Sequence, residues 1–243
     1  MSAAISDLRD VIVHAIDNDP RTLQTALGPS DIANGCDRCL AHVLAGHERR
    51  HQSAAWLPTI GRAFHEWAET AVLQHLARTG SDRYLPEVAV TVGQLRGHDI
   101  TGHSDLFDIH TGTVVDYKLV GKTTITQAKR GPKATYRNQI HLYGKGIAAR
   151  GHNVRDVAVW YLPRNAISLD AGHVFTEPYD ATLADAALAR ANAIAAGVDS
   201  LGADAVLEQM PPHTGQEFTC TSWADEQLTP SAPPSAADFL GVS

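Results

Sequence analysis

The spacing of the apolar residues changes abruptly near residue 80, and this change limits the folds open to the chain. Residues 53–79 are predicted to be helical, because apolar side chains recur at helical spacing at Ile60, Phe64, Trp67 and Ala71. The next three segments alternate between apolar and polar side chains, as strands do. They are residues 84–92, 98–109 and 113–120, with a turn at His110-Thr111-Gly112 between the last two. A helix over 134–150 and a strand over 154–162 complete the pattern.

Further helices are predicted on both sides of this core. Pro20 interrupts the first of them, and Ser30 or Asp31 can cap the second. The expected segments are one or two helices within 4–28, a helix from 30 or 31 to about 45, a weak strand over 173–178 and an alanine-rich helix over 181–196. The order of elements predicts a mixed α/β (α+β) fold with an α-β-β-β-α-β core and extra N- and C-terminal helices.

The composition excludes several classes of protein. No apolar run approaches the roughly 20 residues that a membrane-spanning helix needs. Residues 1–10 carry three charged side chains where a secretory signal would have an apolar segment. The three cysteines, an odd number, do not suggest a disulfide framework. We therefore expect a cytoplasmic protein that does not associate with membranes.

The charge of the 243-residue chain is unevenly distributed. The formal net charge is −7, and the seven acidic residues that follow Arg190, where there is no Lys or Arg, account for all of it. Residues 118–150, in contrast, hold eight basic residues and no acid. Such a stretch can bind phosphate groups or can form the solvated face of a helix, and the charge alone favours neither.

Residues 116–118 (Asp-Tyr-Lys) place a carboxylate and an ammonium group on the same face of a strand, because side chains alternate along it. By itself this pattern also describes an ordinary surface ion pair. A hairpin closed near residue 111 would place Asp105 about opposite Lys118 and diagonal to Asp116. Two carboxylates this close repel unless a cation lies between them, which predicts a Mg²⁺ or Mn²⁺ site. The alternative is two exposed acids on a hairpin.

Four short motifs follow one another in the order of the predicted elements. They are Gly61-x-x-x-His65, Gly102-His103-Ser104-Asp105, Asp116-Tyr117-Lys118 and Gln139-x-x-x-Tyr143. In this order they resemble the motifs of the PD-(D/E)XK nuclease superfamily, specifically its RecB-like exonucleases, including CRISPR-associated and phage-encoded single-domain members. Residues 114–122 and 136–146 also resemble actinobacterial and actinophage members. The resemblance covers about residues 30–220 and implies a restriction-endonuclease-like fold.

The resemblance implies catalytic and metal-binding roles for the matching residues. Asp105 and Asp116 would bind the metal, with His65 and the carbonyl oxygen of Tyr117 as further ligands. Lys118 would orient or activate the attacking water and stabilise charge on the phosphate. These roles agree with the chemistry of phosphodiester hydrolysis, in which a divalent cation neutralises developing negative charge.

The same resemblance implies contacts to DNA. Gln139 and Tyr143 would hold the strand near the scissile phosphate, and their i, i+4 spacing places them on one face of the predicted helix. Lys122 and Arg137 of the basic stretch are expected to add to the DNA-binding surface. Glu87 is a candidate for a residue that supports the metal ligands.

The cysteines leave several interpretations open. Cys36-x-x-Cys39 and Cys220 can serve a [4Fe–4S] cluster or a zinc site, with His213 as a conceivable fourth ligand. Several relatives hold a [4Fe–4S] cluster with one early and three late cysteines, and this chain departs from that arrangement. We expect reduced thiols packed in a core instead of a cluster.

The sequence therefore predicts a single nuclease domain over residues 1–228 and a disordered tail over 229–243. The domain is expected to be a metal-dependent DNA exonuclease, a hydrolase that acts in DNA recombination, repair or processing. An oligomer and recombination or CRISPR-type protein partners are compatible with it. One alternative is a catalytically silent DNA-binding or assembly module of the same fold, and another is a metal-dependent enzyme with a different substrate. The complete set of Asp105, Asp116 and Lys118 favours the nuclease.

Overall fold

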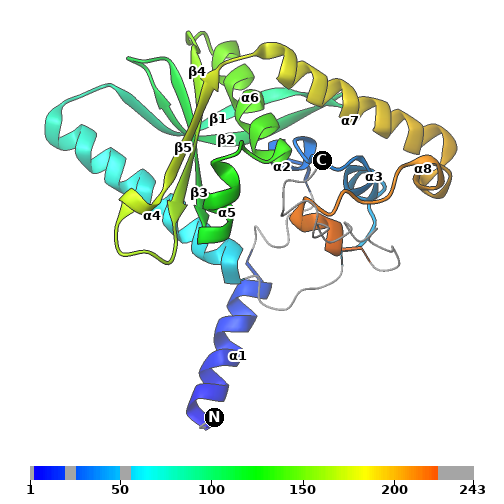
Figure 1. The fold of residues 1–243 in the computed structure, drawn as a ribbon, viewed down its shortest axis with the longest axis horizontal. Coiled ribbons are helices and arrows are strands. Elements are labelled where there is room, and N and C mark those ends of the chain that lie inside the picture. The colour runs from blue at the N-terminus through cyan, green and yellow to red at the C-terminus, as the bar shows by residue number, and fades with distance from the viewer. Residues whose placement is uncertain (1–2, 20–25, 50–55, 224–243) are drawn as a thin grey trace, which may run out of the picture.

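The computed structural model of the chain describes residues 3–19, 26–49 and 56–223, and its centre is a five-stranded sheet (Figure 1). The strands follow the order β1-β2-β3-β4-β5 across the sheet. Their bounds are β1 Tyr84–Leu95, β2 His98–Asp108, β3 Thr113–Val120, β4 Asp156–Pro163 and β5 His173–Pro178. These strands match the five predicted segments, so the sequence located every strand of this sheet.

The sheet is mixed. β1, β2 and β3 pair antiparallel through short connections, and β5 returns antiparallel to β4. β3 and β4 run parallel, which requires the chain to cross over between them. The crossover consists of α5 (Lys122–Ala128) and α6 (Ala134–Ala149). The predicted mixed α/β fold with an α-β-β-β-α-β core is thereby confirmed.

Helices cover the two faces of the sheet unequally. α6 and α7 (Ala181–Leu201) cover one face and enclose the main apolar core, in which Ile140 of α6 meets strand residues such as Val114. α4 (Trp56–Thr79) covers the other face, where Phe64 and Ala68 pack against Tyr117. Successive residues of β3 therefore serve opposite faces, because side chains alternate along a strand.

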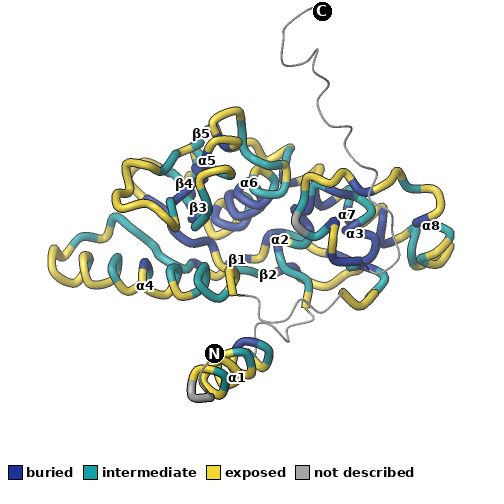
Figure 2. Tube along the Cα trace, turned by 60° about the horizontal axis from the view of Figure 1, so that its bottom comes forward, coloured by how far each residue is buried: buried dark blue, intermediate teal, exposed yellow. Residues whose placement is uncertain are grey.

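α4 is a half-exposed helix. Among the described residues of this helix only Ala68 is buried, and Figure 2 shows most of its turns as exposed or intermediate. Trp67 belongs to the predicted apolar set but is 65% exposed, because it lies beside the face that Phe64 and Ala68 bury. The helical spacing thus predicted the helix correctly but wrongly included Trp67 among its buried residues.

The predicted single helix from residue 30 or 31 to about 45 is wrong. The chain forms two short helices, α2 (Pro29–Ile32) and α3 (Asp37–Leu44). Arg190 of α7 donates hydrogen bonds to the carbonyl oxygens of Ile32 and Asn34, and the Asn34 side chain accepts one from the Cys36 amide. These contacts satisfy the backbone between the two helices, and the first helix follows Gly28 at its N-cap.

The remaining elements are two helices and two 3₁₀ turns. α1 extends away from the body (Figure 1), η1 lies between β4 and β5, and α8 and η2 follow the sheet toward the C-terminal end of the described chain. Their bounds are α1 Ala3–Asp17, η1 Leu169–Ala171, α8 Ala203–Gln209 and η2 Phe218–Thr221. Pro20, the predicted domain limit at 228 and the predicted tail over 229–243 lie outside the described residues. Across residues 3–19, 26–49 and 56–223, no helix has the length and apolar character needed to cross a membrane.

Candidate active site

A cleft with a volume of about 840 Å³ opens between α2, α4, the sheet and α6. It brings together side chains that are distant in the sequence. The titratable and polar residues of interest that line it are His65, Glu87, Asp105, Asp116, Lys118, Gln139 and Tyr143. All of them except Glu87 belong to the four motifs. One cleft therefore holds three carboxylates, a lysine, a histidine and an amide side chain.

Asp105 is the residue that links the helix to the strands. Its Oδ2 accepts a hydrogen bond of 2.6 Å from the backbone amide of Tyr117 on β3, and its Oδ1 lies 3.3 Å from Nδ1 of His65 on α4. His65 Nδ1 also lies 4.0 Å from Oε1 of Glu87 on β1. Burial opposes protonation of His65, but the hydrogen bond and charge of Asp105 outweigh it and raise the pKa of the imidazole.

Glu87 adopts a backbone conformation that is uncommon for a residue with a side chain. Its φ of 45° lies in the left-handed region, and the β1–β2 pairing has a gap between Pro86↔Leu106 and Val88↔Ser104. Glu87 and Asp105 therefore face each other in a break of the ladder. A left-handed backbone conformation at a residue with a side chain persists only where the surrounding structure holds it. The break in the β1–β2 ladder is therefore part of the structure of the cleft.

Asp116 and Lys118 form a buried ion pair. Nζ of Lys118 lies 3.0 Å from Oδ1 and 2.8 Å from Oδ2 of Asp116, which is 1% exposed. The contact with Oδ2 is an ion pair whose geometry is not that of a hydrogen bond, so this buried oxygen accepts no hydrogen bond. Burial raises the pKa of Asp116 to about 6 against the opposing charge of Lys118. Burial disfavours the charged lysine, but Asp116 and Asp105 outweigh it, and the pKa of Lys118 is raised.

α6 extends this pair toward the rest of the cleft. Gln139 accepts a hydrogen bond of 3.1 Å from Nζ of Lys118 through Oε1, and its Nε2 donates one of 3.1 Å to the hydroxyl of Tyr143. Nζ of Lys118 also lies 5.0 Å from the ring centroid of Tyr136. The one-turn spacing of Gln139 and Tyr143 brings their side chains into contact. The contacts that begin at Asp116 therefore continue through Lys118 to these two residues of α6.

Two motif glycines shape the walls of the cleft. A Cβ on Gly102 would lie 2.7 Å from Cγ of Pro29, so the absence of a side chain lets α2 approach β2 closely. A Cβ on Gly61 would have nothing within 4 Å, and this residue lies one turn before His65. Gly102 therefore permits close packing, whereas Gly61 leaves open space beside the imidazole.

The predicted strand register is wrong by two residues. The β2–β3 pairing includes Phe107↔Val114 and ends at Leu106↔Val115, which places Asp105 level with Asp116, not with Lys118. The turn before β3 is longer than expected because β2 ends at Asp108. The Asp108 carboxylate accepts hydrogen bonds from the backbone amides of His110 and Thr111 and so closes this turn. The two acids remain neighbours across the strands despite the shift.

The basic stretch does not form one continuous surface. Arg137 makes a bidentate ion pair with Glu177 of β5, with nitrogen–oxygen distances of 2.6 and 2.7 Å, and Lys145 pairs with Asp185 at 2.6 Å. Lys122 is exposed at the start of α5. Neither Arg137 nor Lys122 lines the cleft, so their predicted DNA contacts remain predictions. Acids about 40 residues away in the sequence neutralise these two members of the stretch, which charge counting could not reveal.

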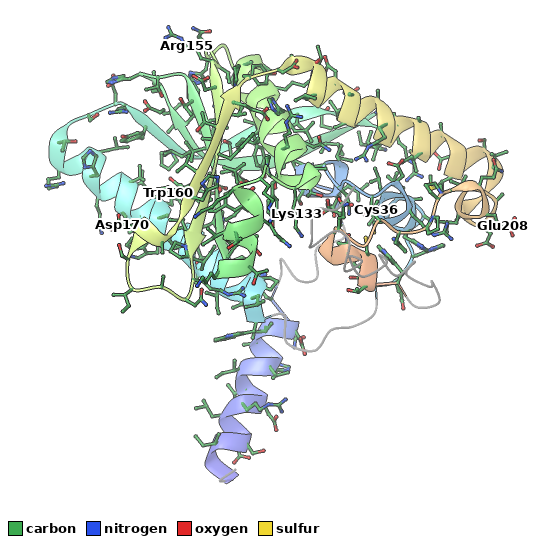
Figure 3. The ribbon with its side chains drawn as sticks, viewed as in Figure 1. Cys36, Lys133, Arg155, Trp160, Asp170 and Glu208 are labelled. Atoms are coloured by element: carbon green, nitrogen blue, oxygen red, sulfur yellow. The ribbon has the colours of Figure 1, made fainter. Side chains whose placement is uncertain are left out.

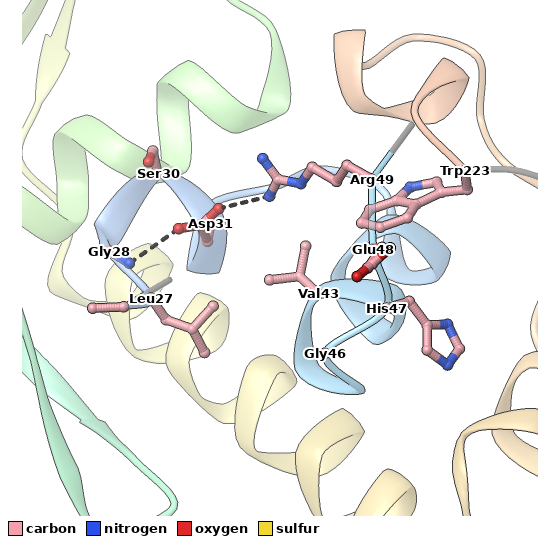
Figure 4. Close-up of a pocket in the computed structure, with 11 residues that line it drawn as sticks. Leu27, Gly28, Ser30, Asp31, Val43, Gly46, His47, Glu48, Arg49 and Trp223 are labelled. Carbon is pink, nitrogen blue, oxygen red and sulfur yellow. Dashed lines mark hydrogen bonds and ion pairs between the residues drawn. The ribbon is translucent and has the colours of Figure 1, made fainter. Parts of the chain in front are cut away.

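The three cysteines lie together outside this cleft, in a small buried cluster with Trp223. A second cavity of about 520 Å³ lies beside Trp223, between α2 and α3 (Figure 4). Arg49 spans it: its Nη2 lies 3.2 Å from Oδ1 of Asp31, and its guanidinium carbon lies 5.7 Å from the Trp223 ring centroid. This cavity offers no counterpart to the set of acids and lysine in the first cleft.

The donor atoms of the first cleft fit a hard divalent cation. His65, Glu87 and Asp105 each offer a ligand atom within 4.8 Å of the other two. Asp116 is outside this group of three, and its buried Oδ2 has no hydrogen-bond donor. Three carboxylates in one cleft repel, and oxygen ligands with one imidazole suit Mg²⁺ or Mn²⁺. Sequence reasoning gave Glu87 only a supporting role, and its distorted strand position explains why alternation could not place it.

Comparison with known proteins yields likenesses of structure only. No family model and no curated protein matches the chain. An alkaline exonuclease (LHK-Exo) from Laribacter hongkongensis is similar with a TM-score of 0.45 and 14% identity, over 76% of this chain and 90% of that chain. LHK-Exo in complex with dAMP gives a TM-score of 0.43 at the same identity and coverage. SSO0001 gives 0.43 with 13% identity, over 80% of this chain and 86% of that chain.

Proposed function

We propose that this chain is a metal-dependent deoxyribonuclease, an exonuclease of the PD-(D/E)XK type, that hydrolyses phosphodiester bonds in the cleft between α4 and α6. The observation that carries the proposal is the convergence of Asp105, Asp116 and Lys118 with Gln139 in that cleft. We further propose one nuclease domain over residues 1–228. Its RecB-like affiliation and its roles in DNA recombination, repair or processing rest on the motif resemblance, and its proposed cytoplasmic location rests on the odd number of cysteines.

The acids of the cleft would hold the cation. Asp105 and Asp116 are the proposed ligands, with His65 and Glu87 beside Asp105 as additional donors and the Tyr117 carbonyl oxygen as a backbone ligand. When bound, Mg²⁺ or Mn²⁺ supplies positive charge that neutralises phosphoryl oxygens and makes water more acidic. The 3.3 Å between His65 Nδ1 and Asp105 Oδ1 places the imidazole beside the carboxylate that would share the cation with it.

Lys118 is held between an acid and an amide, and this position defines its role. Its ammonium group contacts Asp116 and Gln139, so its direction is constrained on two sides. Because it remains protonated, it acts by orienting the attacking water and stabilising negative charge on the phosphate instead of accepting a proton. Gln139 and Tyr143 are positioned on the same side to hold the nucleic-acid strand.

Cleavage assays with matched substitutions test the proposal. End-labelled linear single- and double-stranded DNA and covalently closed circular DNA are incubated with Mn²⁺, Mg²⁺ or EDTA. We expect metal-dependent degradation of linear DNA from its ends, and its loss in Asp116→Asn with DNA binding retained. Asp99→Asn, at an exposed position of β2, is the control and should remain active.

Three outcomes would contradict the proposal. Cleavage that survives Asp116→Asn would exclude this cleft as the site. DNA binding without cleavage by the folded wild-type protein under every metal condition would instead support the noncatalytic DNA-binding module. Absence of both DNA binding and cleavage would remove nucleic acid as the substrate.

A further inference from the structure

Three cysteines and one histidine from opposite ends of the described chain meet in a cluster that is separate from the cleft. Cys36 is the N-cap of α3 and Cys39 lies in its first turn, whereas His213 and Cys220 follow α8. The exposed fractions of the four residues are between 0% and 3%. Figure 3 shows Cys36 where α3 approaches the C-terminal segment.

The donor atoms of this cluster converge on one point. Nδ1 of His213 lies 3.5 Å from Sγ of Cys36 and 3.2 Å from Sγ of Cys39. Sγ of Cys39 lies 3.6 Å from Sγ of Cys220. All four donor atoms lie within 4.8 Å of one another. The group therefore places three sulfurs and one nitrogen as close together as the ligands of a single metal ion.

These distances agree with the edges of a tetrahedral zinc site. With Zn–S bonds of about 2.3 Å and Zn–N bonds of about 2.0–2.1 Å, tetrahedral angles put two sulfurs about 3.8 Å apart and a sulfur and a nitrogen about 3.6 Å apart. The measured separations of 3.6, 3.5 and 3.2 Å are close to these values. Cys₃His is a common ligand set of closed structural zinc sites, in which four protein ligands complete the coordination.

Other occupants fit the cluster less well. A [4Fe–4S] cube is bound by four cysteines, and its four irons and four sulfides need donor sulfurs farther apart than a single ion does. The 3.6 Å between Cys39 and Cys220 is too long for a disulfide, which requires about 2.05 Å. The apolar part of the cluster is small, because Trp223 and the half-buried Val43 are its members besides the three cysteines.

The surrounding contacts explain what a metal ion would do here. Residues 210–223 form only the short 3₁₀ turn η2, and few apolar side chains hold them to the body. Polar contacts join this segment to the rest: Asn34 donates to Thr219 Oγ1 at 2.9 Å, and Lys133 donates to the Gln216 carbonyl at 2.9 Å. A metal ion would replace the missing apolar core by linking two segments that are about 175 residues apart in sequence.

Aromatic stacking already fixes the orientation of one donor. The ring of His42 on α3 stacks on His213 with a centroid separation of 5.8 Å and on Trp223 with one of 4.7 Å. The imidazole of His213 is thereby held nearly parallel to the His42 ring, with Nδ1 within 3.5 Å of the sulfurs of Cys36 and Cys39. Such outer contacts commonly hold a metal-binding histidine in place.

We propose that Cys36, Cys39, His213 and Cys220 form a structural zinc site that fastens the C-terminal segment to α3. The site is independent of the proposed nuclease cleft, with which it shares no residue. Its loss releases residues 213–223 from α3 and leaves the carboxylate cleft chemically complete.

Metal analysis of the full-length protein tests this site. The protein is purified without added metal, washed with EDTA to remove weakly held ions, and analysed for zinc and iron by mass spectrometry. We expect about one zinc per chain and negligible iron, unchanged in an Asp105→Asn/Asp116→Asn variant that removes the carboxylate site. Cys39→Ser, Cys220→Ser and His213→Gln should each lose the zinc. His141→Gln, the same change in a buried histidine of α6 that does not contact the cluster, should retain it.

Cobalt substitution gives a second measurement that does not depend on any variant. Replacement of zinc in the folded wild-type protein by Co²⁺ should give the intense visible bands of tetrahedral cobalt and thiolate-to-cobalt charge transfer in the near ultraviolet. A protein that contains iron in place of zinc, that has no metal and three titratable thiols, or that carries a Cys39–Cys220 disulfide would overturn the proposal. Zinc that disappears in the carboxylate variant would overturn it equally.

Discussion

The carboxylate of Asp105 accepts a hydrogen bond of 2.6 Å from the backbone amide of Tyr117 on the neighbouring strand. The backbone pairing of β2 and β3 ends at Leu106↔Val115, directly beside Asp105. The Asp105 side chain therefore holds the two strands together just beyond the end of this pairing, where the strands separate and the cleft opens. The same carboxylate contacts His65 through its other oxygen, so the residue has both a structural and a proposed catalytic role.

This double role predicts different effects for two substitutions of Asp105. Asp105→Ala leaves the buried Tyr117 amide without a partner and should lower the free energy of unfolding by about 1–3 kcal/mol. Asp105→Asn keeps an acceptor oxygen and should cost less than about 1 kcal/mol, while both variants lose metal-dependent cleavage. Urea denaturation and the cleavage assay measure the two effects. Equal destabilisation by both variants would contradict the role assigned to this hydrogen bond.

His65 should set the metal preference. An imidazole ligand is tolerated better by Mn²⁺ than by Ca²⁺ or Mg²⁺, so cleavage is expected to be faster with Mn²⁺ than with Ca²⁺. His65→Asp would give an all-oxygen donor set and should lower the ratio of the Mn²⁺ rate to the Mg²⁺ rate. Initial rates at saturating metal measure this ratio. His75→Asp, at an exposed position of α4, is the control, and a ratio that is unchanged in His65→Asp would argue against imidazole ligation.

The two motif glycines should respond in opposite directions to alanine. Gly102→Ala places a methyl group against Pro29 at 2.7 Å and should destabilise the fold by about 1–3 kcal/mol through overpacking. Gly61→Ala adds a methyl group in open space inside α4 and should stabilise the fold by about 0.5–1 kcal/mol, because alanine favours helices. Thermal denaturation distinguishes them, and destabilisation by Gly61→Ala would show that the space beside His65 is already filled.

Glu177 should make the stability of the fold dependent on pH. Hydrogen bonds from Arg137 and His141 hold the pKa of Glu177 below its ordinary value of 4.5, although burial of the carboxylate opposes this shift. The ionised Glu177 therefore stabilises the fold above pH 4.5, and this contribution is lost as the pH falls through the lowered pKa.

Glu177→Gln should accordingly lower the free energy of unfolding by about 1–2 kcal/mol at pH 7, with a smaller difference from wild type below pH 4.5. Asp185→Asn breaks the more exposed pair with Lys145 and should cost about 0.5 kcal/mol or less. Denaturant titrations at several pH values from pH 3 to 8 measure both variants. A Glu177→Gln difference that grows as the pH falls would contradict the direction of the pKa shift.

Local patterns were sufficient for the elements that carry the motifs. Alternation in β3 put Asp116 and Lys118 on one face, and the structure joins their side chains at 2.8 Å. The spacing of Gln139 and Tyr143 put them on one face of α6, where they share a hydrogen bond. Both inferences need only the periods of a strand and a helix, which the covalent geometry of the chain imposes at short range.

Contacts between distant segments were not accessible in the same way. The register of β2 and β3 depends on how Asp108 closes the turn, and the break between α2 and α3 depends on Arg190, about 155 residues away. Glu87 reaches His65 because its backbone leaves the strand conformation, which no alternation rule describes. The meeting of Cys36 and Cys39 with His213 likewise requires the whole chain to fold, because loop closure and packing, not sequence spacing, bring such residues together.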